Sequence, residues 1–199
     1  GCTASFVSPN GLMLTNHHCS RGHVPSVTRA GENLLEEGFY AASLDAERRA
    51  ESMYAEQLVA IEDVTDEVYA ALAGAQTDAE RAAAREEAIQ RITERVRREA
   101  GETTGLEAGD VAVQVVSLYN GGRYSAYTFR RYDDVRLVQL PELALGYYGG
   151  DPDNFTYPRY ALDMTFWRVY GDDGRPLQTE NYFSYSPEGV QEGDPVFVV

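Results

Sequence analysis

The sequence has 199 residues, of which 43% are hydrophobic and 25% are charged, as in a globular protein that can bury a sizeable core. Its formal net charge of −15 argues against a nucleic-acid-binding protein, which needs a basic surface. No apolar run approaches the roughly 20 residues of a membrane-spanning helix, and no signal peptide is recognisable at the start.

A β-hairpin over residues 3–15 is the first predicted element, with Gly11 supplying a positive φ in its turn. The only two cysteines, Cys2 and Cys19, flank this hairpin. Strands that return alongside each other would bring the two residues within bridging distance, so we predict a disulfide. A metal pair and two free thiols are the alternatives. A disulfide indicates an oxidising compartment, and we therefore expect a periplasmic or secreted protein.

The middle of the chain predicts a helical excursion over about residues 45–101, which contains a short strand at 58–61. Its clearest helix follows Thr77, because Thr77 and Glu80 fit a Thr-x-x-Glu capping box. Apolar residues then recur at helical spacing. Gly101 is expected to end this helix.

From residue 111 onward the sequence predicts β-structure, in an order that indicates a mainly β protein with a helical insertion. The expected strands cover residues 111–119, 123–131, 135–140, 161–170, 182–185 and 196–199. A loop rich in Gly, Asp and Tyr occupies residues 141–158. The chain begins without a Met and stops within an apolar run, so we expect a piece of a longer protein.

His18 and Asp163 are the candidate catalytic residues. A serine peptidase needs a nucleophile, a base that takes its proton, and a carboxylate that orients the base. His18 lies at the predicted end of a strand beside Cys19, where a disulfide would limit its movement. Asp163 lies in a predicted apolar strand, where burial is costly unless a donor such as an imidazole N–H pairs with it. The alternatives are a packed or surface histidine and a solvent-facing aspartate.

The loop before Asp163 is a candidate binding segment. Asn154 could accept a hydrogen bond from a substrate ammonium group, and Phe155 could wall the pocket or lie against the cation. The alternative is a connector rich in turns.

Three histidines and a cysteine cluster near the N-terminus, which raises the question of a metal site. These residues are His17, His18, Cys19 and His23. Adjacent residues on a strand point to opposite faces, and no second Cys/His pair of zinc-finger type exists. We therefore expect no metal and no cofactor.

Together these residues resemble the S46 family of bacterial dipeptidyl peptidases, over essentially the whole chain. The matching segments are residues 1–3, 6–12, 14–19, 61–65, 149–151, 153–154, 158–159, 163 and 166–170. The resemblance implies that His18 is the catalytic base, Asp163 its orienting acid, and Asn154 part of the site for the substrate's N-terminal amine. The family usually has Trp after this Asn, where this chain has Phe155.

The resemblance also implies a fold and an activity. The fold would be the first barrel of a chymotrypsin-like double β-barrel over residues 1–192, with the first strand of the second barrel at 193–199. The activity would be that of a serine exopeptidase that releases dipeptides from peptides with a free N-terminus. Its serine would lie beyond Val199, so the fragment alone is expected to be inactive.

Two other functions remain open at this point. They are a trypsin-like endopeptidase on the same fold and a non-catalytic peptide-binding module. Peptides are the expected partners in each case, and the resemblance allows a homodimer of the full-length protein.

Overall fold

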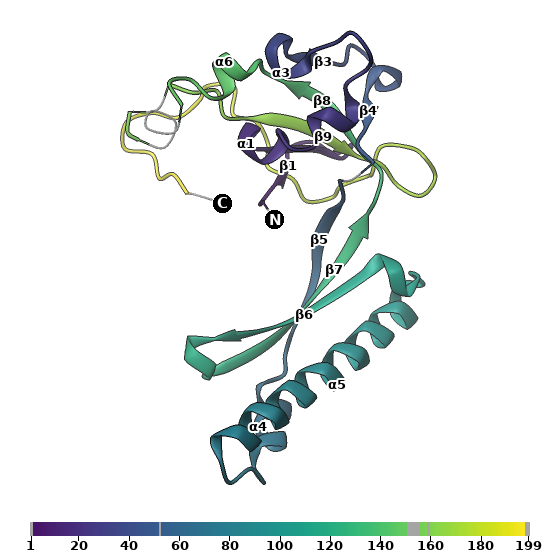
Figure 1. Cartoon of the computed structure of the whole chain (residues 1–199), viewed down its shortest axis with the longest axis vertical. Coiled ribbons are helices and arrows are strands. Elements are labelled where there is room, and N and C mark those ends of the chain that lie inside the picture. Colours follow the sequence, from purple (N-terminus) through teal and green to yellow (C-terminus); the bar gives the residue numbers. More distant parts are fainter. Residues whose placement is uncertain (1, 52, 151–155, 159, 198–199) are drawn as a thin grey trace. The chain divides into compact units, whose positions relative to one another are not determined.

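A computed structural model describes residues 2–51, 53–150, 156–158 and 160–197. The chain is mainly β with several helices, as the sequence predicts, and it forms two compact units (Figure 1). Unit 1 comprises the chain up to Tyr54 and from Asp133 onward, and unit 2 is Ala55–Tyr132. In the part of the chain that the structure describes, none of the helices is sufficiently long and apolar to cross a membrane.

Unit 1 is built on an antiparallel sheet. Its strands are β1 (Ser5–Phe6), β2 (Leu12–Thr15), β3 (Phe39–Tyr40), β4 (Arg48–Arg49), β8 (Val135–Leu140) and β9 (Thr165–Val169). They are ordered β1-β2-β9-β8-β3, and β4 also pairs with β8. Thr15 lies opposite Thr165 in the β2–β9 pair. The residues that follow β2 and those that precede β9 therefore meet at one end of the sheet.

The core of unit 1 lies on β8 and β9, where Val135, Leu137, Trp167 and Val169 are fully buried. In each strand two of these residues are separated by one position, as the period of two in a strand requires. Gly11 has the positive φ expected for the first turn, at 71°. A Cβ there would lie 2.6 Å from the Val169 carbonyl oxygen, so glycine is required.

Short helical turns connect the strands of unit 1. They are α1 (His17–Ser20), α2 (Val24–Val27), α3 (Leu34–Glu37), the 3₁₀ turn η1 (Leu44–Ala46) and α6 (Leu143–Gly146). The strand expected at 161–170 is shorter than predicted and begins at Thr165. Residues 182–185 and the described residues 196–197 form no strand, although Phe183 N–H donates to the Phe6 carbonyl of β1 at 2.9 Å.

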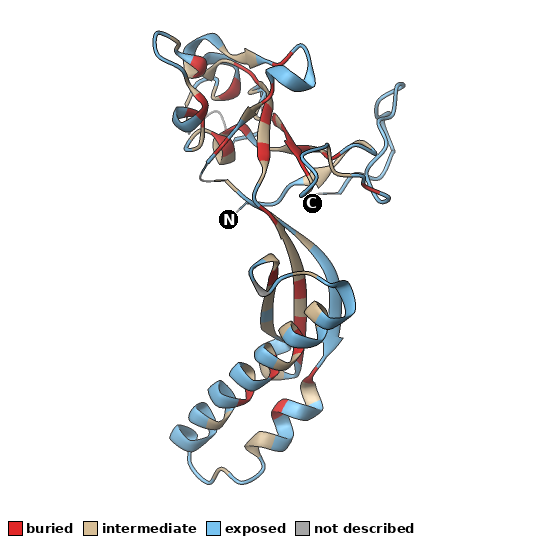
Figure 2. Cartoon of the chain, turned by 90° about the vertical axis from the view of Figure 1, so that its right-hand side faces the viewer, coloured by how far each residue is buried: buried red, intermediate tan, exposed pale blue. Residues whose placement is uncertain are grey.

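Unit 2 is a three-stranded antiparallel sheet with two helices on one face (Figure 1). Its elements are β5 (Ala55–Asp63), α4 (Thr65–Leu72), α5 (Asp78–Thr104), the 3₁₀ turns η2 (Ala108–Asp110) and η3 (Tyr119–Gly121), β6 (Val111–Leu118) and β7 (Arg123–Tyr132). Val68, Ile92 and Val96 pack from the helices against Tyr124 and Ala126 of the sheet. Exposed residues predominate along the rest of α5 (Figure 2).

The insertion differs from the helical excursion expected over about residues 45–101. Residues 45–54 belong to unit 1, and the inserted unit continues to Tyr132. The reason is that β5 and β7 pair along most of their length, so strands rather than helices bound the insertion. The division of the chain into residues 1–192 and 193–199 stays a prediction.

The long helix confirms its predicted start but not its predicted end. Thr77 Oγ1 accepts a hydrogen bond from Glu80 N–H, and the Glu80 carboxylate accepts one from Thr77 N–H, which completes the capping box. The helix passes through Gly101 and ends before Gly105, whose φ of 68° is left-handed. A glycine inside a helix costs about 1 kcal/mol, which neighbouring turns can offset, so Gly101 did not have to be the end.

Candidate active site

The candidate site lies where β2 ends and β9 begins. After Thr15 the chain turns at Asn16 into α1, so His18 is in a helical turn and not at a strand end as predicted. Asp163 precedes β9 and therefore does not lie within a strand as predicted. Asn16 is the residue before this helix, but its side chain does not cap the helix and instead donates to Asp163. Both candidate residues thus stand just outside the β2–β9 ladder.

His18 and Asp163 face each other and make two contacts. His18 Nδ1 lies 2.7 Å from Asp163 Oδ2, and the His18 backbone N–H donates to Asp163 Oδ1 at 2.9 Å. The two side chains are 32% and 17% exposed. A carboxylate can only accept, so Nδ1 carries the proton and Nε2 carries the basic lone pair of the neutral ring. The arrangement is therefore suited to general-base chemistry at Nε2.

A chain of hydrogen bonds holds α1 against β9. The buried Trp167 indole N–H donates to Ser20 Oγ at 2.9 Å, and Ser20 Oγ donates to the Asn16 carbonyl at 3.1 Å. The Asn16 side-chain amide donates in turn to the Asp163 carbonyl at 3.1 Å. Asn16, Ser20 and Trp167 were not predicted from the sequence as parts of the site. The one signal was the position of Asn16 directly before the two histidines.

Cys2 and Cys19 form a disulfide, which confirms the predicted pairing. Their Cα atoms are 6.1 Å apart, and the bond ties α1 to the residues that precede β1. The loop that it closes contains β1 and β2 and ends at the residue after His18. The disulfide therefore restrains the helical turn that presents His18.

We predict that the Cys2→Ser/Cys19→Ser double variant lowers the free energy of unfolding by about 3 kcal/mol, the loop entropy of a closed loop of this length. Urea denaturation of both proteins under non-reducing conditions measures the difference. Wild-type protein treated with a reductant is the control and is expected to match the double variant. Equal midpoints for oxidised wild type and the double variant would contradict the prediction.

His17 is fully buried and has a structural environment. Its Nε2 lies 3.1 Å from the Pro141 carbonyl oxygen, to which it donates. Gly146 lies against the ring, since a Cβ there would be 2.6 Å from two of its carbons. Burial lowers the pKa of His17 below its ordinary value of 6.5, although the Pro141 carbonyl acts in the opposite direction. His17 therefore fixes the segment before α6 and is not presented for base catalysis.

The lowered pKa of His17 predicts a pH-dependent stability. Unfolding restores the ordinary pKa, so the unfolded chain binds more protons and the free energy of unfolding falls as the pH drops below about 6.5. His17→Gln keeps a donor for Pro141 but does not titrate in this range. Chemical denaturation between pH 5 and 8 should give a shallower pH slope for this variant than for wild type. Identical slopes would show that His17 does not carry the effect.

A buried ionic network fixes the far end of β9. Arg168 Nε donates to Glu47 Oε1 at 2.8 Å, and Tyr170 Oη donates to Glu47 Oε2 at 2.8 Å. The Glu47 side chain is only 2% exposed. Burial raises the pKa of Tyr170 to about 12, with a further contribution from the hydrogen bond to Glu47. Glu47 is thus paired through both carboxylate oxygens, which anchors the strand that leads from Asp163.

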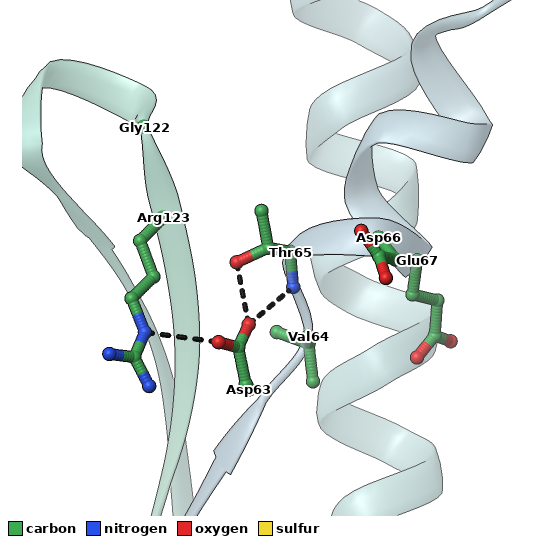
Figure 3. A pocket seen from close by; sticks show the side chains of 7 residues that line it. All are labelled: Asp63, Val64, Thr65, Asp66, Glu67, Gly122 and Arg123. Carbon is green, nitrogen blue, oxygen red and sulfur yellow. Dashed lines mark hydrogen bonds and ion pairs between the residues drawn. The ribbon is translucent and has the colours of Figure 1, made fainter.

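A separate hollow lies in unit 2 and contains none of the predicted site residues. Figure 3 shows Asp63 between Thr65 and Arg123. Asp63 Oδ1 accepts from Thr65 N–H at 3.0 Å and from Thr65 Oγ1 at 2.6 Å, and Asp63 Oδ2 pairs with Arg123 Nε at 3.1 Å. These bonds lower the pKa of Asp63. Asp63 and Thr65 belong to a segment that resembles the S46 family, and here Asp63 ends β5 and Thr65 begins α4.

Two predicted binding residues, Asn154 and Phe155, lie outside the described residues. Across the residues that the structure does describe, no three His, Cys, Asp or Glu side chains are grouped so that they could hold a metal ion. In particular, the His17 ring is bound to the Pro141 carbonyl and the His18 ring to Asp163.

Comparisons with known proteins give a consistent result. The family model described as Peptidase S46 matches residues 1–199. The chain is 36% identical over 211 residues to the Asp/Glu-specific dipeptidyl-peptidase of Shewanella putrefaciens, covering 99% of this chain and 27% of that protein. It is 32% identical over 204 residues to the dipeptidyl-peptidase 7 of Capnocytophaga gingivalis, covering 98% of this chain and 27% of that protein.

A solved structure is also similar. It is the crystal structure of Porphyromonas endodontalis DPP11 in complex with the dipeptide Arg-Asp, with a TM-score of 0.80 at 27% sequence identity. The match covers 98% of this chain and 29% of that chain. The sequence thus spans less than a third of the length of these similar proteins.

Proposed function

Because the chain belongs to the peptidase S46 family, we propose that it is part of a serine exopeptidase that releases dipeptides from the free N-terminus of peptides. The observation that carries this proposal is the pairing of His18 and Asp163, at 2.7 Å between ring nitrogen and carboxylate. This is the base and orienting acid that a serine nucleophile needs. The similar proteins named dipeptidyl-peptidases support the substrate class.

The proposed reaction is acyl transfer. A serine beyond Val199 attacks the carbonyl after the second residue of the peptide, while His18 Nε2 takes the hydroxyl proton. Asp163 holds Nδ1–H and stabilises the imidazolium that forms. His18 then donates the proton to the leaving amine, and water releases the dipeptide by the same steps in a second half-reaction. The substrate ammonium group is proposed to be anchored by Asn154 beside Phe155.

The fold and location follow as further proposals. The antiparallel sheet of unit 1, which presents His18 and Asp163 at one end, supports its assignment as the first of two chymotrypsin-like barrels. The second barrel would come from the remainder of the full-length enzyme, and a homodimer is compatible with this arrangement. The Cys2–Cys19 disulfide supports a periplasmic or secreted protein.

A comparison of free and blocked substrates tests the activity. The full-length enzyme is assayed with dipeptidyl-coumarin amides whose second residue is acidic or apolar, each with a free or an acetylated N-terminus. We expect acetylation to lower kcat/KM by at least about 100-fold, because an acetylated N-terminus has no positive charge for the proposed amine site to bind. Equal rates on both forms would indicate an endopeptidase, and binding of these compounds without hydrolysis would indicate a peptide-binding module.

A further inference from the structure

The β2–β9 ladder ends before it reaches the proposed catalytic acid. Its last pair is Thr15 and Thr165, two residues short of Asp163. The backbone ladder therefore fixes Thr165 but not Asp163, and the position of Asp163 depends on other hydrogen bonds. On the side of β2, the next residue along the chain is Asn16.

The side chain of Asn16 makes the hydrogen bond to the Asp163 backbone that the ladder does not provide. Its Nδ2 donates to the Asp163 carbonyl oxygen at 3.1 Å and lies 3.4 Å from Asp163 Oδ2. Its own backbone carbonyl accepts from Ser20 Oγ, which accepts from the buried Trp167 indole. Asn16 is therefore held by α1 on one side and holds Asp163 on the other.

The two oxygens of the Asp163 carboxylate have different hydrogen-bond partners. Oδ1 accepts from the His18 backbone, whereas Oδ2 accepts from His18 Nδ1 and lies near the Asn16 amide. A donor at position 16 therefore sets where Oδ2 stands relative to the imidazole. An acceptor at the same position would repel both the Asp163 carbonyl and its carboxylate.

We infer that Asn16 is a positioning residue, which acts through Asp163 to hold His18 in the geometry for proton transfer. The inference rests on the proposed peptidase function, because the role that it gives Asn16 is to support proton transfer by His18 in that reaction. Asn16 itself is exposed, so its replacement opens no cavity and the fold should persist. Displacement of a catalytic group by about 1 Å can cost on the order of 100-fold in rate, whereas substrate binding elsewhere is unaffected.

Two variants of the full-length enzyme distinguish the loss of the Asn16 hydrogen-bond donor from the effect of an added charge. Asn16→Asp replaces the donor by an acceptor of the same shape, and Asn16→Leu removes the donor without adding charge. We expect kcat to fall about 10- to 100-fold in both, with KM unchanged within about twofold. Asn10→Asp is the matched control, because Asn10 lies in the turn before β2, away from Asp163, and its Oδ1 already accepts from Arg168. It should keep the wild-type kcat.

A spectroscopic measurement tests the geometry without turnover. The proton on His18 Nδ1, bound to Asp163 Oδ2, should give a far-downfield ¹H NMR signal that His18→Ala removes. Both Asn16 variants are expected to shift or broaden this signal, and Asn10→Asp is expected to leave it in place. If wild type hydrolyses no dipeptidyl substrate, the proposed function fails, but the NMR comparison still decides the role of Asn16.

The inference would be overturned by either of two results. One is a wild-type signal and wild-type kcat in both Asn16 variants. The other is a loss confined to Asn16→Asp, because that would reflect an added charge and not a lost donor. Matched melting temperatures across the series confirm that folded proteins are compared.

Discussion

Replacing His18 by alanine in the full-length enzyme is expected to lower kcat by about 10⁴- to 10⁶-fold, the range found when the base of a serine triad is removed. The reason is specific to the proposed chemistry. Without the imidazole, no group takes the proton from the serine hydroxyl or returns it to the leaving amine. The residual rate would come from substrate binding and from stabilisation of the oxyanion alone.

The loss should leave the fold intact. The His18 side chain is about one-third exposed, at 32%, so its removal creates little buried cavity. The steady-state rate with a saturating dipeptidyl substrate that has a free amine gives kcat. Circular dichroism with a melting curve shows whether the fold is retained. His23→Ala is the control and should keep kcat within about twofold of wild type. A His18→Ala enzyme with more than a tenth of the wild-type kcat would rule out His18 as the base.

The elements with strong local signals were predictable from sequence. Thr77 and Glu80 mark the start of α5 because a capping box satisfies backbone groups within one turn of the chain. The strands of the 111–132 hairpin, likewise, are joined by a short turn with a recognisable Asn-Gly sequence. In both cases the residues that decide the structure are close neighbours in sequence.

The strand ends and the insertion boundary were not predictable in the same way. Whether residues 161–164 extend β9 depends on a partner, and the ladder with β2 stops at Thr15 because the chain turns into α1 there. The bounds of unit 2 depend on β5 pairing with β7, which lie far apart in sequence. These features are tertiary, so local propensity could not fix them.

The candidate site shows the same division. His18, Asp163 and both cysteines were identified from residue type and context, and the structure brings each pair together. Asn16 was not identified, because nothing in its neighbouring sequence indicates a contact with the segment before β9. Only its distance from Asp163, 147 positions away in sequence, reveals the second contact.

Asp163→Asn is expected to lower kcat of the full-length enzyme by about 10³- to 10⁴-fold while preserving the shape of the site. Asparagine can place its oxygen where Oδ1 accepts from the His18 backbone. Its NH₂ group then faces His18 Nδ1 and donates to it, so the ring proton moves to Nε2. In that tautomer Nε2 has no lone pair for the serine proton, and the imidazolium that forms later has no carboxylate beside it.

The variant separates orientation of the ring from its chemistry. Because the substitution is isosteric, KM for a free-amine dipeptidyl substrate should stay within about twofold while kcat falls. The downfield proton assigned to His18 Nδ1 should disappear, since that nitrogen becomes the acceptor. Asp66→Asn, at an exposed position in unit 2, is the matched control and should change neither quantity. A wild-type kcat in Asp163→Asn would mean that the carboxylate only packs against α1, and the assignment of Asp163 as the orienting acid would fail.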